Sequence, residues 1–337
     1  MVPVVDTQSL FVLDSASGSL VAHRLDIGTI RWRSARVRPP ARGTESEGAP
    51  PALLMTDAAV LIIDSVARAF HRTSGVPLWE SRAIAPSLSG SLLTPTAGGV
   101  LVLGGRNEIV RLDPSSGRLM WRSPFPVGCT PVALDADGAL TVVSLAACGD
   151  RRYGTVLALR TATGEVAWRA PIPDSTRARY AAYIVHVLDR TIVALDNAQL
   201  GALDDEGRDS WSGPTETAGL IPPFAGVRPF SAVGRTIISI GTNDVTGTDV
   251  RSGEERWRIR SSVLPVPTNR GPVGGGARFG FVAGTARTVS SVSAAGAWAW
   301  YVPTPPSPLQ RPVHLLGVED DVIVIYGTGV ARWGAVR

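Results

Sequence analysis

The amino-acid sequence predicts an all-β protein in which one four-stranded sheet is repeated along the chain, and three observations support this. First, the 337 residues include 36 Gly and 26 Pro, and short runs rich in Val, Ile and Thr end at turn residues, as strands do. Second, seven tryptophans recur at intervals of 42 to 47 residues. Third, no stretch shows the 3.6-residue apolar period of helices, which excludes a helical repeat of this length.

A glycine stands four positions before each of these seven tryptophans. In "RLDPSSGRLMW" a strand ends before Asp113, whose carboxylate can accept hydrogen bonds from backbone N–H groups of the turn. Gly117 then supplies the left-handed conformation that returns the chain, and Trp121 lies on the next strand. The aspartate is missing from some copies, whereas the glycine and the tryptophan persist. The seven pairs are Gly28 and Trp32, Gly75 and Trp79, Gly117 and Trp121, Gly164 and Trp168, Gly207 and Trp211, Gly253 and Trp257, and Gly296 and Trp300.

Each repeat contains four strand-like segments, such as "PALLM", "AVLIID", "ARAFHR" and "PLWES" in the second repeat. Antiparallel sheets of this size bury both faces when they stack radially and close into a ring, which is a β-propeller. We therefore expect each tryptophan to lie on an outer strand and to fill the gap between neighbouring blades. Its indole N–H should find a backbone acceptor there.

The spacing predicts one propeller domain over residues 1–337, with eight blades of four antiparallel strands and an incomplete last blade; seven blades are the alternative. The last blade has three predicted strands, and Trp333 belongs to the third of them, so its spacing from Gly329 is a coincidence. Residues upstream of Met1 in a longer native chain could supply the fourth strand. The approximate blades are 1–35, 50–82, 90–124, 128–171, 179–213, 221–261, 272–302 and 311–337.

A strand, an "LD" turn, "TG", three residues and Trp form a pattern that resembles the PQQ-like (BamB-like) propeller repeat. The segment "VLALRTATGEVAWRAPIP" is close to a full copy, and the resemblance covers essentially the whole chain. Similar repeats occur in quinoprotein dehydrogenases, in the outer-membrane assembly lipoprotein BamB and in sensor domains of bacterial envelope proteins. The motif specifies a blade rather than a reaction, so function must be argued separately.

Resemblance to the quinoprotein dehydrogenases would imply a Ca²⁺ site, an Asp base and commonly two adjacent cysteines. Here Cys129 and Cys148 are far apart in sequence, and no residue matches that site. We therefore expect no enzyme activity and no cofactor, and a dehydrogenase is the least favoured alternative. The "GPVGGGARFG" segment lacks the pattern of a phosphate loop and is expected to be an inter-blade loop.

No metal site is expected. The four histidines lack the short spacing of a zinc site, and the most acidic segment lacks the oxygen spacing of a calcium loop. We expect packed or edge-strand histidines and a solvated acidic turn. The residues are His23, His71, His186 and His314, and Asp196, Asp204, Asp205, Glu206 and Asp209.

The charge pattern indicates a solvated basic surface rather than a nucleic-acid interface. All 33 basic residues are Arg, the formal net charge is +4, and the arginines are scattered along the chain without clustered stacking aromatics. No apolar run approaches the roughly 18 to 20 residues that cross a bilayer. We expect neither nucleic-acid binding nor a membrane span.

The two cysteines bear on the compartment. Cys129 and Cys148 flank a predicted hairpin and could form a disulfide, which would suggest an oxidising compartment; two free thiols have equal weight. The compartment therefore stays open: the periplasm or cell envelope if a leader has been removed, the cytoplasm otherwise.

The favoured function is a non-catalytic interaction scaffold that binds protein partners, as a subunit or domain of a bacterial cell-envelope assembly, including a membrane-associated complex. It would bind through face loops or by strand addition at an open blade edge. The alternative is a small-ligand or sensor domain that uses the central funnel. Two long Pro-rich loops are candidate partner sites, with a passive linker as the other reading. They contain Arg36, Arg38, Arg42, Glu45 and Glu47, and Pro305, Pro306 and Arg311.

Overall fold

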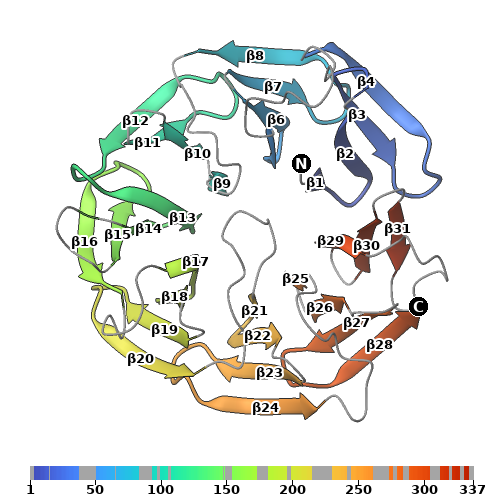
Figure 1. Ribbon diagram of the computed structural model, residues 1–337. Helices are drawn as coiled ribbons and strands as arrows, with labels where there is room; N and C mark the ends of the chain where they lie inside the picture. Colours follow the sequence, from blue (N-terminus) through green and yellow to red (C-terminus); the bar gives the residue numbers. More distant parts are fainter. Residues whose placement is uncertain are drawn as a thin grey trace.

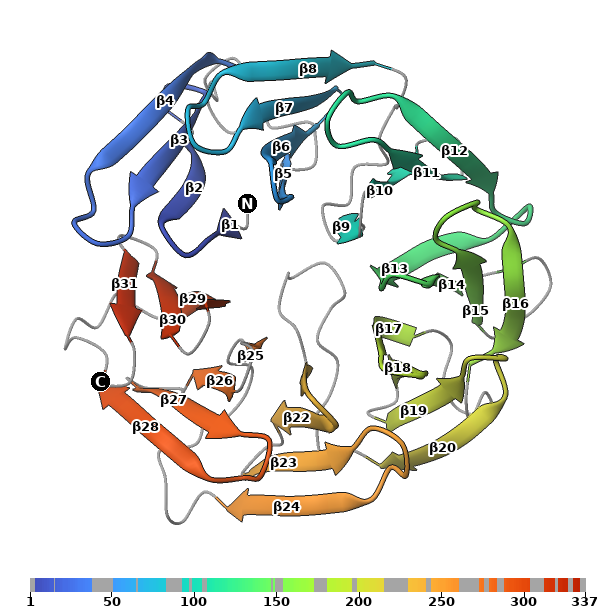
Figure 2. The same cartoon turned by 180° about the vertical axis from the view of Figure 1, so that it is seen from behind.

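The structure is a computed structural model, and its described residues contain strands and turns but no helix. The chain runs around a ring, and each sheet extends outward from the ring's centre (Figures 1 and 2). The described residues are 4–14, 16–37, 51–64, 66–82, 93–96, 99–104, 108–146, 148, 154–172, 181–195, 199–214, 230–240, 244–260, 273–275, 279–283, 288–303, 312–318, 321–326 and 330–333.

The first four sheets are four-stranded antiparallel meanders in which sequence neighbours pair. Their strands, in order, are β1 (Val4–Val5), β2 (Ser9–Asp14), β3 (Ser19–Arg24) and β4 (Ile30–Arg36); β5 (Ala52–Met55), β6 (Ala59–Ile63), β7 (Ala67–His71) and β8 (Pro77–Ser81); β9 (Leu93–Thr96), β10 (Gly99–Gly104), β11 (Glu108–Leu112) and β12 (Leu119–Pro124); and β13 (Thr130–Ala136), β14 (Leu140–Ala146), β15 (Thr155–Arg160) and β16 (Val166–Pro171).

The next three sheets have the same order of four strands, and the last described sheet has three. Their strands are β17 (Ala181–Val187), β18 (Arg190–Leu195), β19 (Gln199–Asp204) and β20 (Asp209–Pro214); β21 (Phe230–Val233), β22 (Thr236–Ile240), β23 (Asp244–Asp249) and β24 (Glu255–Arg260); β25 (Val273–Gly275), β26 (Phe279–Ala283), β27 (Thr288–Ser293) and β28 (Trp298–Pro303); and β29 (Pro312–Val318), β30 (Asp321–Tyr326) and β31 (Val330–Trp333).

The predicted propeller architecture is confirmed by these radially arranged sheets. The first strand of each sheet lies nearest the centre, and the fourth lies on the rim (Figure 1). The last sheet adjoins the first, because β29 contacts β1. As expected, Trp333 lies on the third strand of its sheet, where it pairs with Val322 of β30.

The core lies between neighbouring sheets and is built by the middle strands. All five residues of β6 are buried, which explains why these strands read as continuous apolar runs. One cluster joins Ile109 of β11 to Val143 of β14 and Leu157 of β15, and so connects two adjacent sheets. Each sheet therefore buries its two faces against its two neighbours in the propeller ring.

One sequence expectation is wrong. The "GPVGGGARFG" segment was expected to be an inter-blade loop, but Val273–Gly275 form β25 and Phe279 begins β26. Glycine weakens a strand yet permits close backbone approach, so a short glycine-rich strand can occupy the crowded innermost position.

Candidate functional site

The tryptophan of one blade packs against the glycine turn of the next blade. The turn glycines have positive φ, as the sequence predicts. A Cβ atom built on Gly117 would lie 2.5 Å from Cε3 of Trp79, a separation that real Cβ atoms do not show. Glycine is thus required both by the backbone and by the indole ring. The six pairs are Trp32 with Gly75, Trp79 with Gly117, Trp121 with Gly164, Trp168 with Gly207, Trp211 with Gly253, and Trp257 with Gly296.

Five indole N–H groups bond to backbone carbonyls of the same turns, as the sequence predicts for every copy, and Trp168 departs from that prediction. The buried Nε1 of Trp168 has no hydrogen-bond partner among the described residues. The five bonds run from Trp32 to Arg72 (3.0 Å), from Trp79 to Pro114 (2.9 Å), from Trp121 to Thr161 (3.1 Å), from Trp211 to Val250 (2.9 Å) and from Trp257 to Ala294 (3.0 Å).

The accepting residue is also tied to its own blade. The N–H of Arg72 donates to the carbonyl of Ala58 at 3.1 Å, in the turn between the first two strands of that sheet. Thr161 and Val250 make the equivalent bonds, to Ala139 and Arg235 at 2.9 Å each. One residue therefore connects two turns of its own blade, through its N–H group, to the tryptophan of the preceding blade, through its carbonyl.

The aspartate that precedes the glycine organises the turn, as the sequence predicts for Asp113. Its Oδ1 accepts hydrogen bonds from the N–H groups of Ser115, at 2.8 Å, and Ser116, at 3.2 Å. The hydroxyl of Ser115 is a further donor and is the largest cause of a pKa of Asp113 below its usual value. This carboxylate shapes a turn and faces solvent.

The first blade carries the same turn, and among the described residues no tryptophan lies against it. Gly28 has φ +70°, and a Cβ atom built there would meet nothing within 4 Å. The N–H of Leu25 donates to the carbonyl of Gln8 at 2.9 Å, the bond that Arg72 makes in the second blade. A cavity of about 430 Å³, here called the Gly28 slot, is lined among the described residues by Thr7, Gln8, Arg24, Leu25, Asp26 and Arg31.

The Gly28 slot belongs to the boundary between the first and last sheets. In the other turns the indole comes from the preceding blade, and the sheet that precedes the first around the ring is β29–β31. Both views place the β3–β4 turn beside β31 (Figures 1 and 2). The sequence already contained this signal, because Gly28 is the first glycine of the series and no series tryptophan precedes it.

A buried histidine that the sequence did not single out lies between the fourth and fifth blades. The side chain of His186 is 2% exposed, and its Nε2 lies 3.3 Å from Oδ2 of Asp137. Its Nδ1 lies 2.9 Å from the Thr191 hydroxyl. Burial lowers the pKa of His186, and the carboxylates of Asp137, Asp205 and Asp189 oppose that shift. His186 is therefore a packed histidine, one of the two kinds of position expected for the four histidines.

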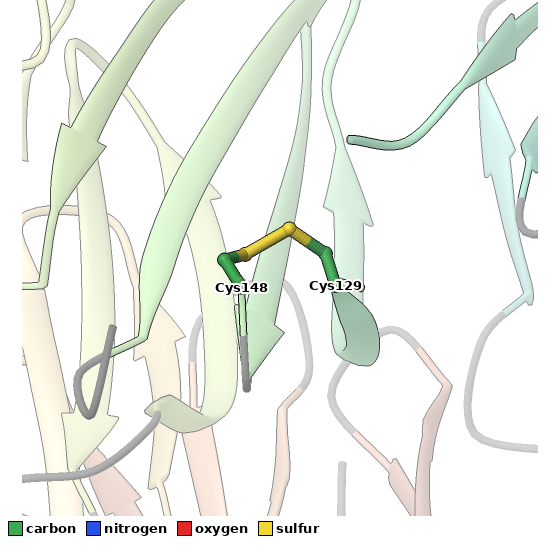
Figure 3. The surroundings of a disulfide bond; sticks show 2 residues. All are labelled: Cys129 and Cys148. Carbon is green, nitrogen blue, oxygen red and sulfur yellow. A yellow bond between two sulfur atoms is a disulfide. The ribbon is translucent and has the colours of Figure 1, made fainter. Parts of the chain in front are cut away.

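Cys129 and Cys148 are joined by a disulfide, one of the two states that the sequence left open (Figure 3). Both are buried, and they pack with Ile109 and Phe125 in the cluster between the third and fourth sheets. The bond connects the segment before β13 to the segment after β14, so it closes the two ends of the predicted hairpin.

Most of the predicted partner-loop residues lie outside the described residues. Arg36 is described: it lies on β4, and its Nε donates to the carbonyl of Ser17 at 3.1 Å within the same sheet. In the acidic segment, Arg208 pairs with Asp204 and Glu206 in an exposed turn, in line with the expected solvated turn. The predicted residues outside the description are Arg38, Arg42, Glu45, Glu47, Pro305, Pro306, Arg311 and Asp196, together with the side chains of Trp300 and His314.

In the part of the chain that the structure describes, no three His, Cys, Asp or Glu side chains are arranged to hold a metal ion. The same part contains no helix that is long and apolar enough to cross a membrane.

Comparison with known proteins identifies the family. The profile of the family described as outer membrane protein assembly factor BamB matches residues 63–219 and 128–271, which together cover more than half of the chain. The chain belongs to the BamB family. A search of curated proteins finds no match.

Solved structures share the fold of this BamB-family chain at low sequence identity. BamB from Moraxella catarrhalis is 17% identical, with a TM-score of 0.63 over 98% of this chain and 92% of that one. The computationally designed Ika8 protein is 11% identical, with a TM-score of 0.68 over 98% and 95%. The C-terminal WD40 domain of Sif2 is 12% identical, with a TM-score of 0.65 over 99% and 93%. These likenesses establish the propeller fold.

Proposed function

We propose that this chain is a non-catalytic interaction scaffold within a bacterial cell-envelope assembly. The observation that carries the proposal is the match to the family described as outer membrane protein assembly factor BamB. That description names assembly at a membrane rather than a reaction. The protein partners of this chain would therefore belong to a membrane-associated complex.

The contacts between the tryptophan of one blade and the glycine turn of the next, here called joints, support a scaffold role. A surface that binds a partner without reorganising must be held rigidly. Here the six turn glycines from Gly75 to Gly296 each lie against an indole of the preceding blade, and turns within a blade are tied to one another by backbone hydrogen bonds. Loops carried on this ring would be presented in fixed positions.

The disulfide supports the envelope location. Disulfides persist in the periplasm and outside the cell, whereas cytosolic thiols are kept reduced. The bond between Cys129 and Cys148 is buried in an interblade cluster, where reductants have little access. An oxidising compartment would fit this pair.

The test is affinity purification of the tagged protein from its native host after cross-linking, with mass spectrometry of the captured proteins. Two matched variants replace residues 38–50 or residues 304–311 by Gly and Ser. We expect a defined set of envelope proteins with the wild-type chain, and loss of that set in at least one loop variant. Capture of the same proteins by both variants would contradict loop binding.

A second measurement tests the non-catalytic part of the proposal. The purified protein is incubated with alcohols or aldoses, pyrroloquinoline quinone and Ca²⁺, and turnover is followed with an artificial electron acceptor. We expect no turnover above a protein-free control. Sustained turnover would show a quinoprotein dehydrogenase instead.

A further inference from the structure

The joint between the fourth and fifth blades lacks a hydrogen bond that the other five described joints make. The ring of Trp168 lies against Gly207, as the other five indoles lie against their glycines. Its Nε1 is nevertheless buried without a hydrogen-bond partner among the described residues. The other five indole N–H groups each donate to a backbone carbonyl. The tryptophan of this joint is therefore in place, and its acceptor is out of reach.

The acceptor that this joint lacks is the carbonyl of Asp205. In the five joints with an indole bond, the acceptor directly follows the residue whose carbonyl accepts the N–H of the turn glycine. In the fifth blade the N–H of Gly207 donates to Asp204 at 3.0 Å, so Asp205 holds the acceptor's place. The length of the turn does not explain the loss, because the turn of Gly296 is equally short and its Ala294 still accepts an indole bond.

A second hydrogen bond is missing from the same blade. In the first, second, fourth and sixth blades, the residue in the acceptor's place donates its N–H to the carbonyl of the residue directly before the second strand. The counterparts in the fifth blade are the N–H of Asp205 and the carbonyl of Asp189, which directly precedes β18. In the described part of the chain no hydrogen bond joins these two groups. The turn that carries Asp205 is thus not tied to its own blade, and its carbonyl does not reach the indole.

The guanidinium of Arg190 lies on the carbonyl of Asp189 instead. Its Nη1 donates to that carbonyl at 2.7 Å and pairs with Oδ2 of the same residue at 3.1 Å. The guanidinium therefore takes the space into which the N–H of Asp205 would point. In the four tied blades the second strand begins with a residue that has no guanidinium: Ser9, Ala59, Leu140 or Thr236.

The backbone of the β17–β18 turn does not account for the difference. The β17–β18 and β21–β22 turns each have two residues, and their first residues, Leu188 and Gly234, both have φ +57°. The second residue of the β21–β22 turn, Arg235, nevertheless accepts the N–H of Val250 at 2.9 Å. Because the two turns are alike in length and in this φ, the side chain of Arg190 is what distinguishes the fifth blade.

The described arrangement leaves two buried donors without a partner among the described residues, Nε1 of Trp168 and Nε of Arg190. A buried donor without a partner is destabilising. A joint of the usual form would pair the indole with Asp205, and the guanidinium would turn to solvent, where its Nε can bond to water. The Arg190 side chain is already 20% exposed. This change pairs both donors and breaks the two contacts with Asp189, so the free energies of the two arrangements are close.

We propose that the joint between the fourth and fifth blades is a two-state device controlled by Arg190. In the described state the guanidinium lies on the carbonyl of Asp189, and the indole N–H of Trp168 has no acceptor among the described residues. In the second state the guanidinium turns to solvent, the N–H of Asp205 bonds to Asp189, and the carbonyl of Asp205 accepts the indole N–H. This inference rests on the contacts of the joint and is independent of the proposed scaffold function.

The first test observes the indole N–H by NMR of the full chain with isotope-labelled tryptophan. The Nε1–H signal of Trp168 is the one that Trp168→Phe removes. We expect Arg190→Met to shift this signal to the higher frequency of a bonded N–H and to slow its exchange with solvent about threefold or more. Arg251→Met is the matched control, because its Nε contacts Oδ1 of Asp189, at 3.1 Å, rather than the carbonyl. An unchanged signal in Arg190→Met, or equal shifts in both variants, would overturn the proposal.

The second test asks whether the wild-type protein visits both states. A minor state populated at about 1% or more that exchanges within microseconds to milliseconds is detected by relaxation dispersion. We expect dispersion at Nε1 of Trp168 in the wild type and its loss in Arg190→Met. Trp211 should show none, because its N–H already donates to Val250 at 2.9 Å. A flat profile at Trp168 in the wild type would contradict exchange between two states.

A double-mutant cycle in the equilibrium constant of unfolding gives an independent check. Trp168→Phe should raise this constant about two- to tenfold more in the Arg190→Met background than in the wild type, because only the second state gives the indole an acceptor. Trp211→Phe is the control and should have the same effect in both backgrounds. An equal effect of Trp168→Phe in the two backgrounds would overturn the coupling between the indole and the guanidinium.

Discussion

The indole N–H of Trp121 donates to the carbonyl of Thr161 at 3.1 Å, across the boundary between the third and fourth blades. The same carbonyl accepts a hydrogen bond from Nη1 of the buried Arg111 at 3.0 Å. The ring of Trp121 also lies against Gly164, three residues after Thr161. This contact combines partial burial of a large indole with a satisfied polar group, so Trp121 helps to hold the third and fourth blades together.

Truncation of this joint should destabilise the protein strongly. Trp121→Ala removes the ring contact and leaves a cavity, and we expect a loss of about 3–5 kcal/mol in the free energy of unfolding. Chemical denaturation followed by circular dichroism measures the change. Met120→Ala is the matched control, because that side chain is 43% exposed on the same strand and should cost much less. An unchanged denaturation midpoint for Trp121→Ala would refute the role of the joint.

Loss of the indole N–H should lower the stability of the protein at Trp211 but not at Trp168. Trp211→Phe removes a hydrogen bond to Val250 and should cost about 0.5–1.5 kcal/mol more than Trp168→Phe, whose buried N–H has no partner among the described residues. Paired denaturation curves give the difference. If Trp168→Phe is the more destabilising of the two, the N–H of Trp168 has an acceptor after all.

Removal of the disulfide should weaken the boundary between the third and fourth blades. The bond closes a sequence separation of 19 residues, for which the loss of chain constraint amounts to about 3 kcal/mol. The double variant Cys129→Ser and Cys148→Ser should unfold at a correspondingly lower denaturant concentration than the oxidised wild type. Under strongly reducing conditions the wild type should approach the variant. Identical stability of all three preparations would contradict the prediction.

His186 should make stability depend on pH. Because burial lowers its pKa in the folded protein below 6.5, the unfolded chain binds a proton first as the pH falls. The contribution to stability is therefore fully present above pH 6.5 and decreases below it. His186→Gln should flatten this part of the stability curve. Parallel pH profiles for the wild type and His186→Gln would contradict this.

The blade pattern could be predicted from the sequence because it depends on local geometry. A turn needs an aspartate such as Asp113 and a glycine such as Gly117 at fixed offsets, and the strand that follows repeats at the length of one blade. These features recur often enough to be measured within one chain. They predicted the propeller architecture and the position of each of the seven repeat tryptophans on the fourth strand of its sheet.

The contacts across blade boundaries could not be predicted in the same way. The sequence pairs Gly75 with Trp79, four residues later, but in space the partner of Gly75 is Trp32. Contacts between different blades leave no fixed sequence spacing, because the hairpins differ in length. The same reason hides His186, whose neighbour Asp137 belongs to the preceding blade. The Gly28 slot is defined by its place among these contacts between blades, so the sequence alone indicates only that no repeat tryptophan precedes Gly28.

The account rests on the claim that the six turn glycines from Gly75 to Gly296 are required by the indole of the preceding blade as well as by their own backbone conformation. Gly75 and Gly28 have φ +71° and +70°, but only Gly75 has a tryptophan ring against it among the described residues. Alanine at either position carries the cost of a left-handed residue, about 1–2 kcal/mol. The decisive measurement is the difference in unfolding free energy between Gly75→Ala and Gly28→Ala. We predict that Gly75→Ala is the less stable by a further 1–3 kcal/mol or so, the usual cost of overpacking; equal losses in the two variants would contradict the claim.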